Sequence, residues 1–304
     1  MIGIVILNYN SWEDSKGCIE SICKDRPGAP FRIYLVDNAS PVRPSEAVMD
    51  YCKRQQVVLL EAKENRGYAA GNNIGIAEAM KDSCDAILIS NSDVRFYPHS
   101  IDNMYQCLQQ DPRIGIVGPK IHLPNGRTQR ECMMMRTGMR EKYMLRTRLH
   151  VLAPANNERY WGRQHDYERE TFFVYAVLGC CFMIKGECAK EVMPFDEHTF
   201  LYEEELILGI RMAEKKWSTI YYPKSEILHK HEATTGGIGR NPFAYTCQVC
   251  SEIYYCRHYL QADKREILPL YGYRTLLYLC RCLWNPAFRR KWGEYVERTR
   301  KELG

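Results

Sequence analysis

A polar turn with a single carboxylate interrupts an aliphatic run between residues 87 and 96. The run ILIS gives way to Asn91-Ser92-Asp93, after which VRF resumes the apolar pattern. This pattern predicts a buried strand that ends in a short polar turn. Ligands of open α/β sheets collect at the carboxyl ends of strands, so an acidic residue there is well positioned to hold a divalent cation against a phosphate.

Three further polar turns follow three other aliphatic runs. They are Asn8-Tyr9-Asn10 after IGIVIL, Asp37-Asn38-Ala39-Ser40 after RIYLV, and the longer segment 65–75 after VVLL. In a parallel sheet the carboxyl ends of the strands share one edge, so the four turns can surround a single ligand.

The segment 65–75 carries three glycines, Gly67, Gly71 and Gly75, at a spacing of four residues. This spacing matches neither the GxGxxG fingerprint nor the P-loop, which disfavours a dinucleotide-binding dehydrogenase and leaves it as a third candidate function. Small residues that pack a helix against a sheet also explain the glycines. Together with Arg66 and a helix expected to begin near Gly71, they suggest a backbone approach to phosphate at a helix N-terminus.

The elements that must position these turns alternate between strands and helices over the first 120 residues. The predicted strands are 2–7, 32–36, 57–60, 86–89 and 114–117, and the helix-like stretches between them are 13–25, 44–54, 71–81 and 99–109. This alternation predicts βαβ units and an α/β fold with a mostly parallel sheet that has helices on both faces.

The second half of the chain continues with an apolar block at 172–184, a helix-like segment at 203–215 and a strand-like run at 218–222. Before this block, residues 127–163 hold nine Lys/Arg against three Glu, which fits either a solvated loop or a segment that covers the substrate. From residue 243 onward the pattern is helical and aromatic.

Charge and cysteine content limit the class of protein. The formal net charge is +5, and residues 243–304 account for it with 11 Lys/Arg against 6 Asp/Glu. The 14 cysteines are sparse in a chain of 304 residues. Because the N-terminal apolar stretch is too short for a signal peptide and no run is long enough to span a bilayer, we expect reduced thiols and a cytoplasmic location. The spacing of Cys247, Cys250, Cys256 and His258 favours buried thiols on a helix over a zinc site.

Seven motifs occur in an order that resembles the family 2 glycosyltransferases, in the branch that includes rhamnosyl- and galactofuranosyltransferases. The motifs are NYN, VDNAS, NRGYAAGNNIG, NSD, VGPKI, FDEHTFLYEEELILGIRM and ILHKHEATTG. The resemblance implies a GT-A fold, a Rossmann-like sheet flanked by helices, as a catalytic domain over residues 1–240, with a helical extension over 241–304. It also implies a nucleotide-sugar donor, Mg²⁺ or Mn²⁺, and inversion at the anomeric carbon.

The resemblance assigns roles to the polar turns. Tyr9 and Asp37 would line the nucleobase pocket, and Arg66 would lie near the base and the diphosphate. Asp93 matches the metal-binding carboxylate, and His229 matches a histidine that serves as a further metal ligand, with His231 as its local competitor. The donor-binding residues expected in this way are Tyr9, Asn10, Asp37, Asn38, Arg66, Gly67, Gly71, Asn72, Asn91 and Ser92.

The motif FLYEEELILGIR supplies the expected catalytic acids. Relatives carry an Asp where this chain has Glu205, and Ile207 replaces a second Asp of the family pattern. Glu205 would act as the general base, with Glu204 beside it. Acidic residues at the start of a helix are also explained by the positive end of the helix dipole.

These features predict an inverting glycosyltransferase that moves a sugar from a dTDP-rhamnose or UDP-hexose type of donor to a saccharide or lipid-linked acceptor in cell-surface polysaccharide synthesis. A catalytically silent sugar-nucleotide binding or scaffold protein is the alternative, because Asn91, Glu205 and Ile207 depart from the family pattern. The basic and aromatic segment 243–304 suggests a peripheral contact with the inner face of the cell membrane, a helical cap or a homodimer contact. A nucleic acid partner is not expected, because no binding motif accompanies the charge.

Overall fold

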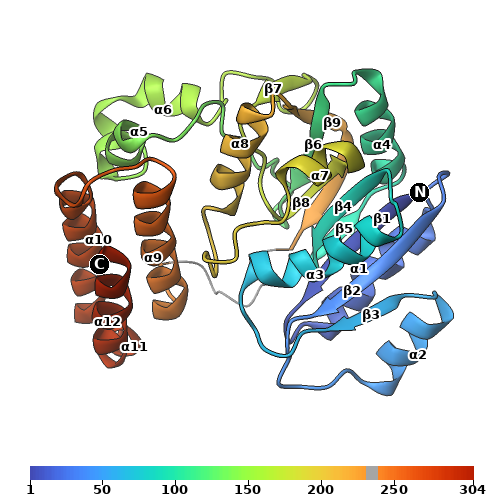
Figure 1. Cartoon of the computed structure of the whole chain (residues 1–304), viewed down its shortest axis with the longest axis horizontal. Helices are drawn as coiled ribbons and strands as arrows, with labels where there is room; N and C mark the ends of the chain where they lie inside the picture. Colours follow the sequence, from blue (N-terminus) through green and yellow to red (C-terminus); the bar gives the residue numbers. More distant parts are fainter. Residues whose placement is uncertain (231–238) are drawn as a thin grey trace.

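The structure is a computed structural model that describes residues 1–230 and 239–304. In these residues, nine strands form one sheet in the order β3-β2-β1-β4-β8-β6-β9-β5, with β7 pairing to β9. The strands are β1 (Ile2–Asn8), β2 (Phe31–Asp37), β3 (Val58–Glu61), β4 (Ala86–Asn91), β5 (Val94–Phe96), β6 (Ile114–His122), β7 (Phe172–Val174), β8 (Cys181–Lys185) and β9 (Ser218–His229). Figure 1 shows this sheet at the centre of the larger part of the molecule.

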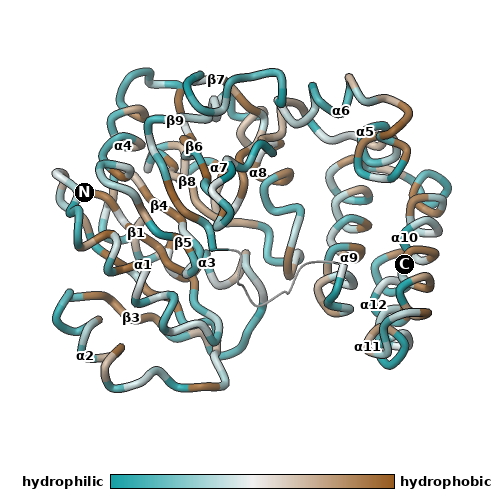
Figure 2. The backbone as a smooth tube through the Cα atoms, turned by 180° about the vertical axis from the view of Figure 1, so that it is seen from behind, coloured by the Kyte–Doolittle hydropathy of each residue, from teal (hydrophilic) through white to brown (hydrophobic). Residues whose placement is uncertain are grey.

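Helices cover both faces of the sheet. Those that pack on the sheet are α1 (Trp12–Lys24), α2 (Glu46–Arg54), α3 (Tyr68–Lys81), α4 (Ser100–Gln110), α7 (Gly186–Val192) and α8 (Glu204–Glu214). Alternate side chains of β1 divide between the faces. Ile4 packs in one core with residues of α1, α2 and α4, and Val5 packs in the other with residues of α3, α7 and α8. Burial on both faces explains why β1 and β4 are aliphatic along most of their length, as the brown stretches of the tube in Figure 2 show.

The direction of the strands changes across the sheet. Strands β3, β2, β1 and β4 are parallel, whereas β8 runs antiparallel to both β4 and β6. Strands β5 and β7 also run antiparallel to β9. The α/β fold with two covered faces is confirmed. The sheet is parallel where the sequence showed a regular alternation of strands and helices, and mixed where that alternation ends.

The rest of the chain forms a helical region that joins the sheet domain through a third core. Its helices are α5 (Met139–Met144), the 3₁₀-helix η1 (Arg148–Leu152), α6 (Pro154–Tyr160), α9 (Pro242–His258), α10 (Lys264–Trp284), α11 (Pro286–Arg290) and α12 (Trp292–Leu303). Residues of α9 to α12 share this core with Ile207 and other residues of α8. Figure 1 shows α5 and α6 beside α9 and α10, although the two pairs are far apart in the sequence.

The C-terminal extension is thus a cap whose aromatic residues are largely internal. Tyr278 is fully buried, and the Ser251 hydroxyl donates to the carbonyl oxygen of Leu201 at 2.8 Å, which ties α9 to the segment before α8. Cys247, Cys250 and Cys256 are buried free thiols on α9. Among the residues that the structure describes, no helix combines the length and the apolar character needed to cross a membrane.

Candidate active site

The polar turns after β1, β2 and β4 meet at the carboxyl edge of the sheet. The Nδ2 atom of Asn8 donates to Asp37 Oδ1 at 3.2 Å and to Ser40 Oγ at 3.1 Å. Hydroxyl oxygens of Ser11 and Ser92 are 2.9 Å apart. These contacts follow from the parallel registers of β1 with β2 and of β1 with β4, which bring the ends of the three strands level.

Asp37 is held in place by one of its two carboxylate oxygens. Its Oδ1 accepts hydrogen bonds from the backbone N–H and the hydroxyl of Ser40 as well as from Asn8, whereas its Oδ2 takes part in no hydrogen bond within the described chain. Nearby, Asn10 has a positive φ of 55° and donates its backbone N–H to Ser40 Oγ at 2.7 Å. Tyr9 is 38% exposed. The arrangement leaves one oriented carboxylate oxygen and one accessible aromatic ring at this edge.

The turn after β3 is fixed by Asn38. Its Nδ2 atom donates to Asn65 Oδ1 at 3.0 Å and to the carbonyl oxygen of Gly67 at 3.1 Å. Between these two partners, Arg66 reaches outward and forms an ion pair with Glu197 at 3.0 Å. Asn38 therefore joins the third turn to the other three, as the sequence predicted.

The prediction that a helix begins near Gly71 is wrong. Helix α3 begins at Tyr68 with Gly67 as its N-cap, and the N–H of Gly71 is already bonded within the helix to the carbonyl oxygen of Gly67. A Cβ atom at Gly71 would lie 2.5 Å from Leu7 Cδ1, and one at Gly75 would lie 2.4 Å from Val5 Cγ1. These two glycines therefore let α3 approach the sheet, which is the packing explanation of their spacing.

Two other residues of this segment also make close contacts with the rest of the protein. Gly67 has a φ of +96° and lies against the backbone of Phe200, so no other residue fits there without strain. Asn72 is fully buried and donates to the carbonyl oxygen of Tyr68 at 3.0 Å. The structure places both beside the other turns but gives them contacts with protein, so their contact with a donor stays a prediction.

The expected metal ligands Asp93 and His229 lie next to each other. The antiparallel pairing of β5 with β9 sets Val94 opposite His229, which brings the imidazole Nε2 to 3.3 Å from Asp93 Oδ1. Both residues are buried. Burial lowers the pKa of His229, but the contacts with Asp93 and with the thiol of Cys180 outweigh it and raise that pKa to about 10.

This pair fits a divalent cation that takes its other ligands from a bound diphosphate and water. One carboxylate and one imidazole are suitable ligands for Mn²⁺, and carboxylate and phosphate oxygens are suitable for Mg²⁺. Within residues 1–230 and 239–304, no group of three or more His, Cys, Asp and Glu forms a cage for a metal ion. His231, the competing candidate, lies outside the described residues.

Two adjacent carboxylates open helix α8. Glu205 Oε1 accepts a hydrogen bond of 3.0 Å from the backbone N–H of Gly179, and Glu204 is 4% exposed. Burial raises the pKa of Glu205 and raises that of Glu204 well above its usual value, and the negative charge of Glu205 raises the latter further. The preceding residues Tyr202 and Glu203 both have positive φ angles, a tight turn that directs the first turn of α8 toward the loop before β8.

The dipeptide Gly179-Cys180 connects the two carboxylate centres, and sequence reasoning missed it. Gly179 donates to Glu205, while the carbonyl oxygen of Cys180 accepts from the N–H of Asn91 at 2.8 Å and its thiol contacts His229. The apolar character of the block 172–184 gave no signal of this role. The carboxylate expected to act as the base and the pair expected to bind metal therefore lie on two sides of one short segment of backbone.

A buried ion-pair cluster behind α8 was also missed. Lys142 is fully buried, with its Nζ 2.6 Å from Glu203 Oε2 and 3.6 Å from Glu252 Oε1. Glu252 in turn accepts two hydrogen bonds from Arg274, at 2.7 and 2.9 Å. The sequence gave only an excess of basic residues around Lys142. Ile207, which departs from the family pattern, is buried in the adjoining hydrophobic core, where a second carboxylate would have no polar surroundings.

The structure thus has an oriented carboxylate at Asp37, a buried Asp93–His229 pair that fits a cation, and a buried carboxylate with a raised pKa at Glu205. A cation and a buried base are the parts needed for displacement of a diphosphate leaving group by a hydroxyl.

Comparison with known proteins identifies relatives of this chain. The model of the family "Glycosyl transferase family 2" matches residues 3–167. Over 220 residues the chain is 30% identical to N-acetylglucosaminyl-diphospho-decaprenol L-rhamnosyltransferase of Mycobacterium tuberculosis, covering 68% of this chain and 69% of the relative. It is 24% identical to the low-salt glycan biosynthesis hexosyltransferase Agl10 of Haloferax volcanii, covering 67% of this chain and 59% of the relative.

Solved structures share the fold. GalNAc-T7 with UDP, GalNAc and Mn²⁺ superposes with a TM-score of 0.62 at 15% identity, over 91% of this chain and 54% of that one, so this chain spans about half of its length. The mannosyltransferase PcManGT of Pyrobaculum calidifontis, in complex with GDP-Man and Mn²⁺, superposes with a TM-score of 0.54 at 14% identity, over 97% and 75%. With its GT-A fold and its matched sequence, the chain belongs to glycosyltransferase family 2.

Proposed function

We propose that this glycosyltransferase moves a sugar, with inversion and with the help of Mg²⁺ or Mn²⁺, from a nucleotide-sugar donor to a lipid-linked saccharide in cell-surface polysaccharide synthesis. The matched rhamnosyltransferase is named for a diphospho-decaprenol acceptor, which supports a lipid-linked acceptor. The two matched structures contain Mn²⁺ with UDP or GDP-Man, which supports a metal and a nucleotide-sugar donor. Donors of the dTDP-rhamnose and UDP-hexose type are the first to test.

The proposed mechanism uses the residues as they lie in the structure. The Oδ2 atom of Asp37 accepts the imide N–H of a uracil or thymine base, with Tyr9 beside it. Asp93 and His229 would hold the cation, which supplies stabilisation of the charge that develops on the leaving diphosphate. Glu205 removes the proton from the acceptor hydroxyl as that oxygen attacks the anomeric carbon. Attack from the side opposite the diphosphate inverts the configuration without a covalent enzyme intermediate.

The contact that carries this proposal is the Gly179-Cys180 bridge. It holds Glu205 through a backbone hydrogen bond of 3.0 Å and contacts His229 through the thiol of Cys180. A base and a leaving-group cation must face each other across one sugar ring, and contacts of both groups with adjacent residues of one segment support such an arrangement. Two unrelated carboxylates on separate surfaces would not.

We further propose that the enzyme works at the cytoplasmic face of the membrane. The C-terminal helices carry a positive charge, and Leu276, Leu283 and Trp284 of α10 are exposed. Basic residues beside exposed apolar side chains favour contact with anionic lipid surfaces.

A donor panel tests the proposed function. Purified protein is incubated with dTDP-rhamnose or UDP-hexoses and a sugar-diphospho-lipid acceptor, with Mn²⁺ or with EDTA. We expect metal-dependent transfer from one donor, a product of inverted configuration by NMR, and a loss of about 10²-fold or more in the variant Asp93→Asn. Nucleotide binding without transfer from any donor would support the alternative, a catalytically silent binding protein. Equal rates of transfer with Mn²⁺ and with EDTA would mean that the cation takes no part in the mechanism.

A further inference from the structure

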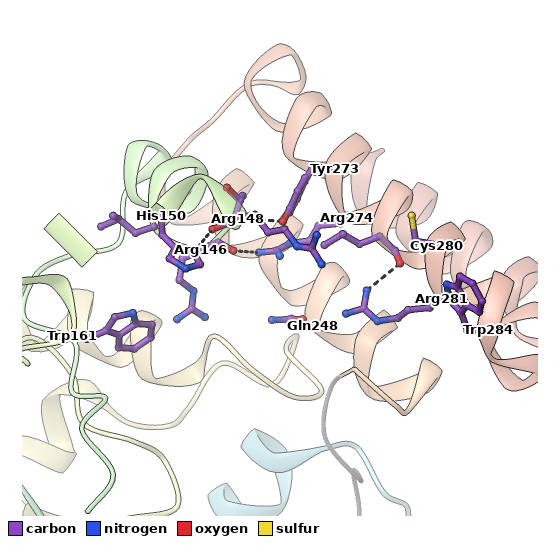
Figure 3. Close-up of a pocket in the computed structure, with 13 residues that line it drawn as sticks. Arg146, Arg148, His150, Trp161, Gln248, Tyr273, Arg274, Cys280, Arg281 and Trp284 are labelled. Atoms are coloured by element: carbon purple, nitrogen blue, oxygen red, sulfur yellow. Dashed lines mark hydrogen bonds between the residues drawn. The ribbon is translucent and has the colours of Figure 1, made fainter. Parts of the chain in front are cut away.

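A cavity of about 660 Å³ lies between the segment around η1, which belongs to the basic stretch 127–163, and the helices α9 and α10. Its lining includes four arginines and one histidine but no Asp or Glu among the residues that the structure describes. The basic lining residues are Arg146, Arg148, His150, Arg274 and Arg281. In Figure 3 the side chains of Arg146, Arg281 and Gln248 project toward the same space from three separate segments.

Three of the four arginines form no ion pair with a carboxylate of the described chain. Arg274 is neutralised by its two bonds to Glu252. Arg146 instead lies 5.4 Å from the centre of the Trp161 ring, and Arg281 lies 4.6 Å from that of Tyr245. Arg148 contributes its backbone N–H to Tyr273 Oη. The rings of Trp161 and Tyr245 support the guanidinium groups of Arg146 and Arg281, and Arg281 also donates from Nε and Nη1 to the carbonyl oxygens of Gly239 and Leu277. No carboxylate of the described chain neutralises these three arginines by an ion pair, so their positive charge suits phosphate oxygens.

The cavity adjoins the catalytic side of the molecule. Arg274 on its wall leads through Glu252 and Lys142 to Glu203, which immediately precedes the first turn of α8. The positive charge of Arg146 also acts to lower the pKa of Glu205. An anion in the cavity is thereby connected through buried ion pairs to the start of the helix that carries Glu205.

Exposed apolar side chains border the cavity. On α10, Leu276 and Leu283 are 58% and 70% exposed, and they lie on one stripe with Cys280, which lines the cavity. Trp284, 85% exposed, lines it as well. Val151 and Leu152 of η1 are also exposed. A cationic hollow with an apolar border is complementary to a diphosphate that carries a hydrocarbon chain, whereas a nucleotide or free phosphate would use only the charged part.

We infer that this cavity binds the diphosphate of a polyprenyl-diphosphate-linked acceptor sugar, with the exposed side chains of α10 and η1 contacting the first isoprenoid units. The inference rests on the proposed function and specifies the acceptor: its sugar would reach Glu205 while its diphosphate stays among Arg146, Arg148 and Arg281. It also gives the basic stretch 127–163 a function in acceptor binding.

Kinetics with two acceptors test the inference. Arg148→Gln and Arg281→Gln are compared with Arg290→Gln, an exposed arginine of α11 outside the cavity lining. For a sugar-diphospho-lipid acceptor we expect KM to rise about tenfold or more in each cavity variant, the usual cost of a hydrogen bond to a charged group. With a neutral alkyl glycoside of the same sugar, and for donor hydrolysis, the cavity variants should match the wild type. An unchanged KM for the diphosphate acceptor in both cavity variants would overturn the inference.

A binding measurement separates failure of this inference from failure of the proposed function, because it needs no turnover. Trp161 lies in the cavity, so quenching of tryptophan fluorescence can follow titration with farnesyl diphosphate, farnesol or inorganic pyrophosphate. We expect farnesyl diphosphate to bind most tightly, to lose about tenfold in affinity in Arg281→Gln, and to keep its affinity in Arg290→Gln. UDP and dTDP should bind equally to all three proteins.

Each other outcome contradicts a stated part of the inference. Equal affinity for pyrophosphate and farnesyl diphosphate would identify the ligand as a free anion rather than a lipid. Equal affinity for farnesol and farnesyl diphosphate would mean that the cavity does not recognise the diphosphate. Weaker binding of UDP or dTDP in Arg281→Gln and Arg148→Gln, with both variants folded by circular dichroism, would assign the cavity to the donor.

Discussion

The proposed donor edge of the sheet and the arginine-lined cavity are built from different kinds of side chain. At the donor edge, the short neutral side chains of Asn8 and Ser40 hydrogen-bond to each other and orient Asp37. In the cavity, long cationic side chains are held by aromatic rings and by backbone carbonyls from distant segments, as when Arg274 donates to the carbonyl oxygen of Arg146. Turns at neighbouring strand ends can therefore place a few polar side chains together by local contacts. A charged cavity instead needs separate helices to pack around it.

The largest effect should come from the carboxylate that lies between the two regions. In Glu205→Gln the amide cannot accept the acceptor proton, and we expect kcat to fall about 10²–10⁴-fold while the affinity for UDP or dTDP is retained. Steady-state transfer assays and nucleotide titrations measure the two quantities. Glu204→Gln is the matched comparison. If Glu204→Gln lost activity and Glu205→Gln did not, Glu204 rather than Glu205 would be the general base.

Stability should depend strongly on the buried charges behind the cavity. In Lys142→Met the buried Glu203 loses its ion-pair partner and the buried Glu252 keeps only Arg274, and we expect a loss of about 3–5 kcal/mol in the free energy of unfolding by urea. Lys81→Met, in an exposed pair with Glu78, should cost less than about 0.5 kcal/mol. Similar losses in the two variants would mean that the buried cluster does not hold the helical cap to the sheet domain.

Glycines in the two regions should respond with opposite sign. At Gly71 a methyl group meets Leu7, so Gly71→Ala should destabilise the fold by about 1–3 kcal/mol. At Gly272 of α10 nothing lies within 4 Å, so Gly272→Ala should stabilise it by about 0.5–1 kcal/mol through its better helix propensity. Thermal or urea unfolding measures both. Gly71→Ala with full stability but reduced nucleotide affinity would instead favour a phosphate contact at this glycine.

A smaller effect links the two regions through charge. Burial raises the pKa of Glu205 above its usual 4.5, and Arg146 acts against that rise. Since the base acts in its ionised form, kcat/KM should fall as the pH drops through this raised pKa. Arg146→Gln should move the midpoint upward, because it removes the positive charge that lowers the pKa of Glu205. The profile is recorded with a neutral glycoside acceptor at saturating Mn²⁺. A downward shift would contradict the proximity of Arg146 to Glu205.

Much of the donor edge could be predicted because its signals are local. An aliphatic run followed by Asn91-Ser92-Asp93 shows both the strand and the turn, and the structure places that turn beside the turns after β1 and β2. The spacing of Gly67, Gly71 and Gly75 was misleading, since a period of four serves close helix packing as well as phosphate contact. Only the start of α3 at Tyr68 and the distance to Leu7 decide between the two.

The other half of the site could not be predicted in the same way. Lys142 and Glu252 are 110 residues apart, and nothing near either residue in the sequence distinguishes it from a solvated surface charge. Gly179-Cys180 lies in an apolar stretch with no polar motif, although the backbone N–H of Gly179 contacts Glu205 and the thiol of Cys180 contacts His229. The roles of these residues depend on burial and on contacts with residues far away in the chain, and a local sequence pattern predicts neither.

By itself, the sequence determined the alternation of strands and helices, the polar turns at the strand ends, the family and the identity of the candidate acids, because each depends on residues close together in the chain. The tertiary structure alone decided that Asp93 meets His229, that one backbone segment lies between them and Glu205, and that arginines of η1 and α10 surround one cavity. The physical reason is that burial and charge pairing are properties of the packed state, in which residues far apart in the chain share one low-dielectric interior.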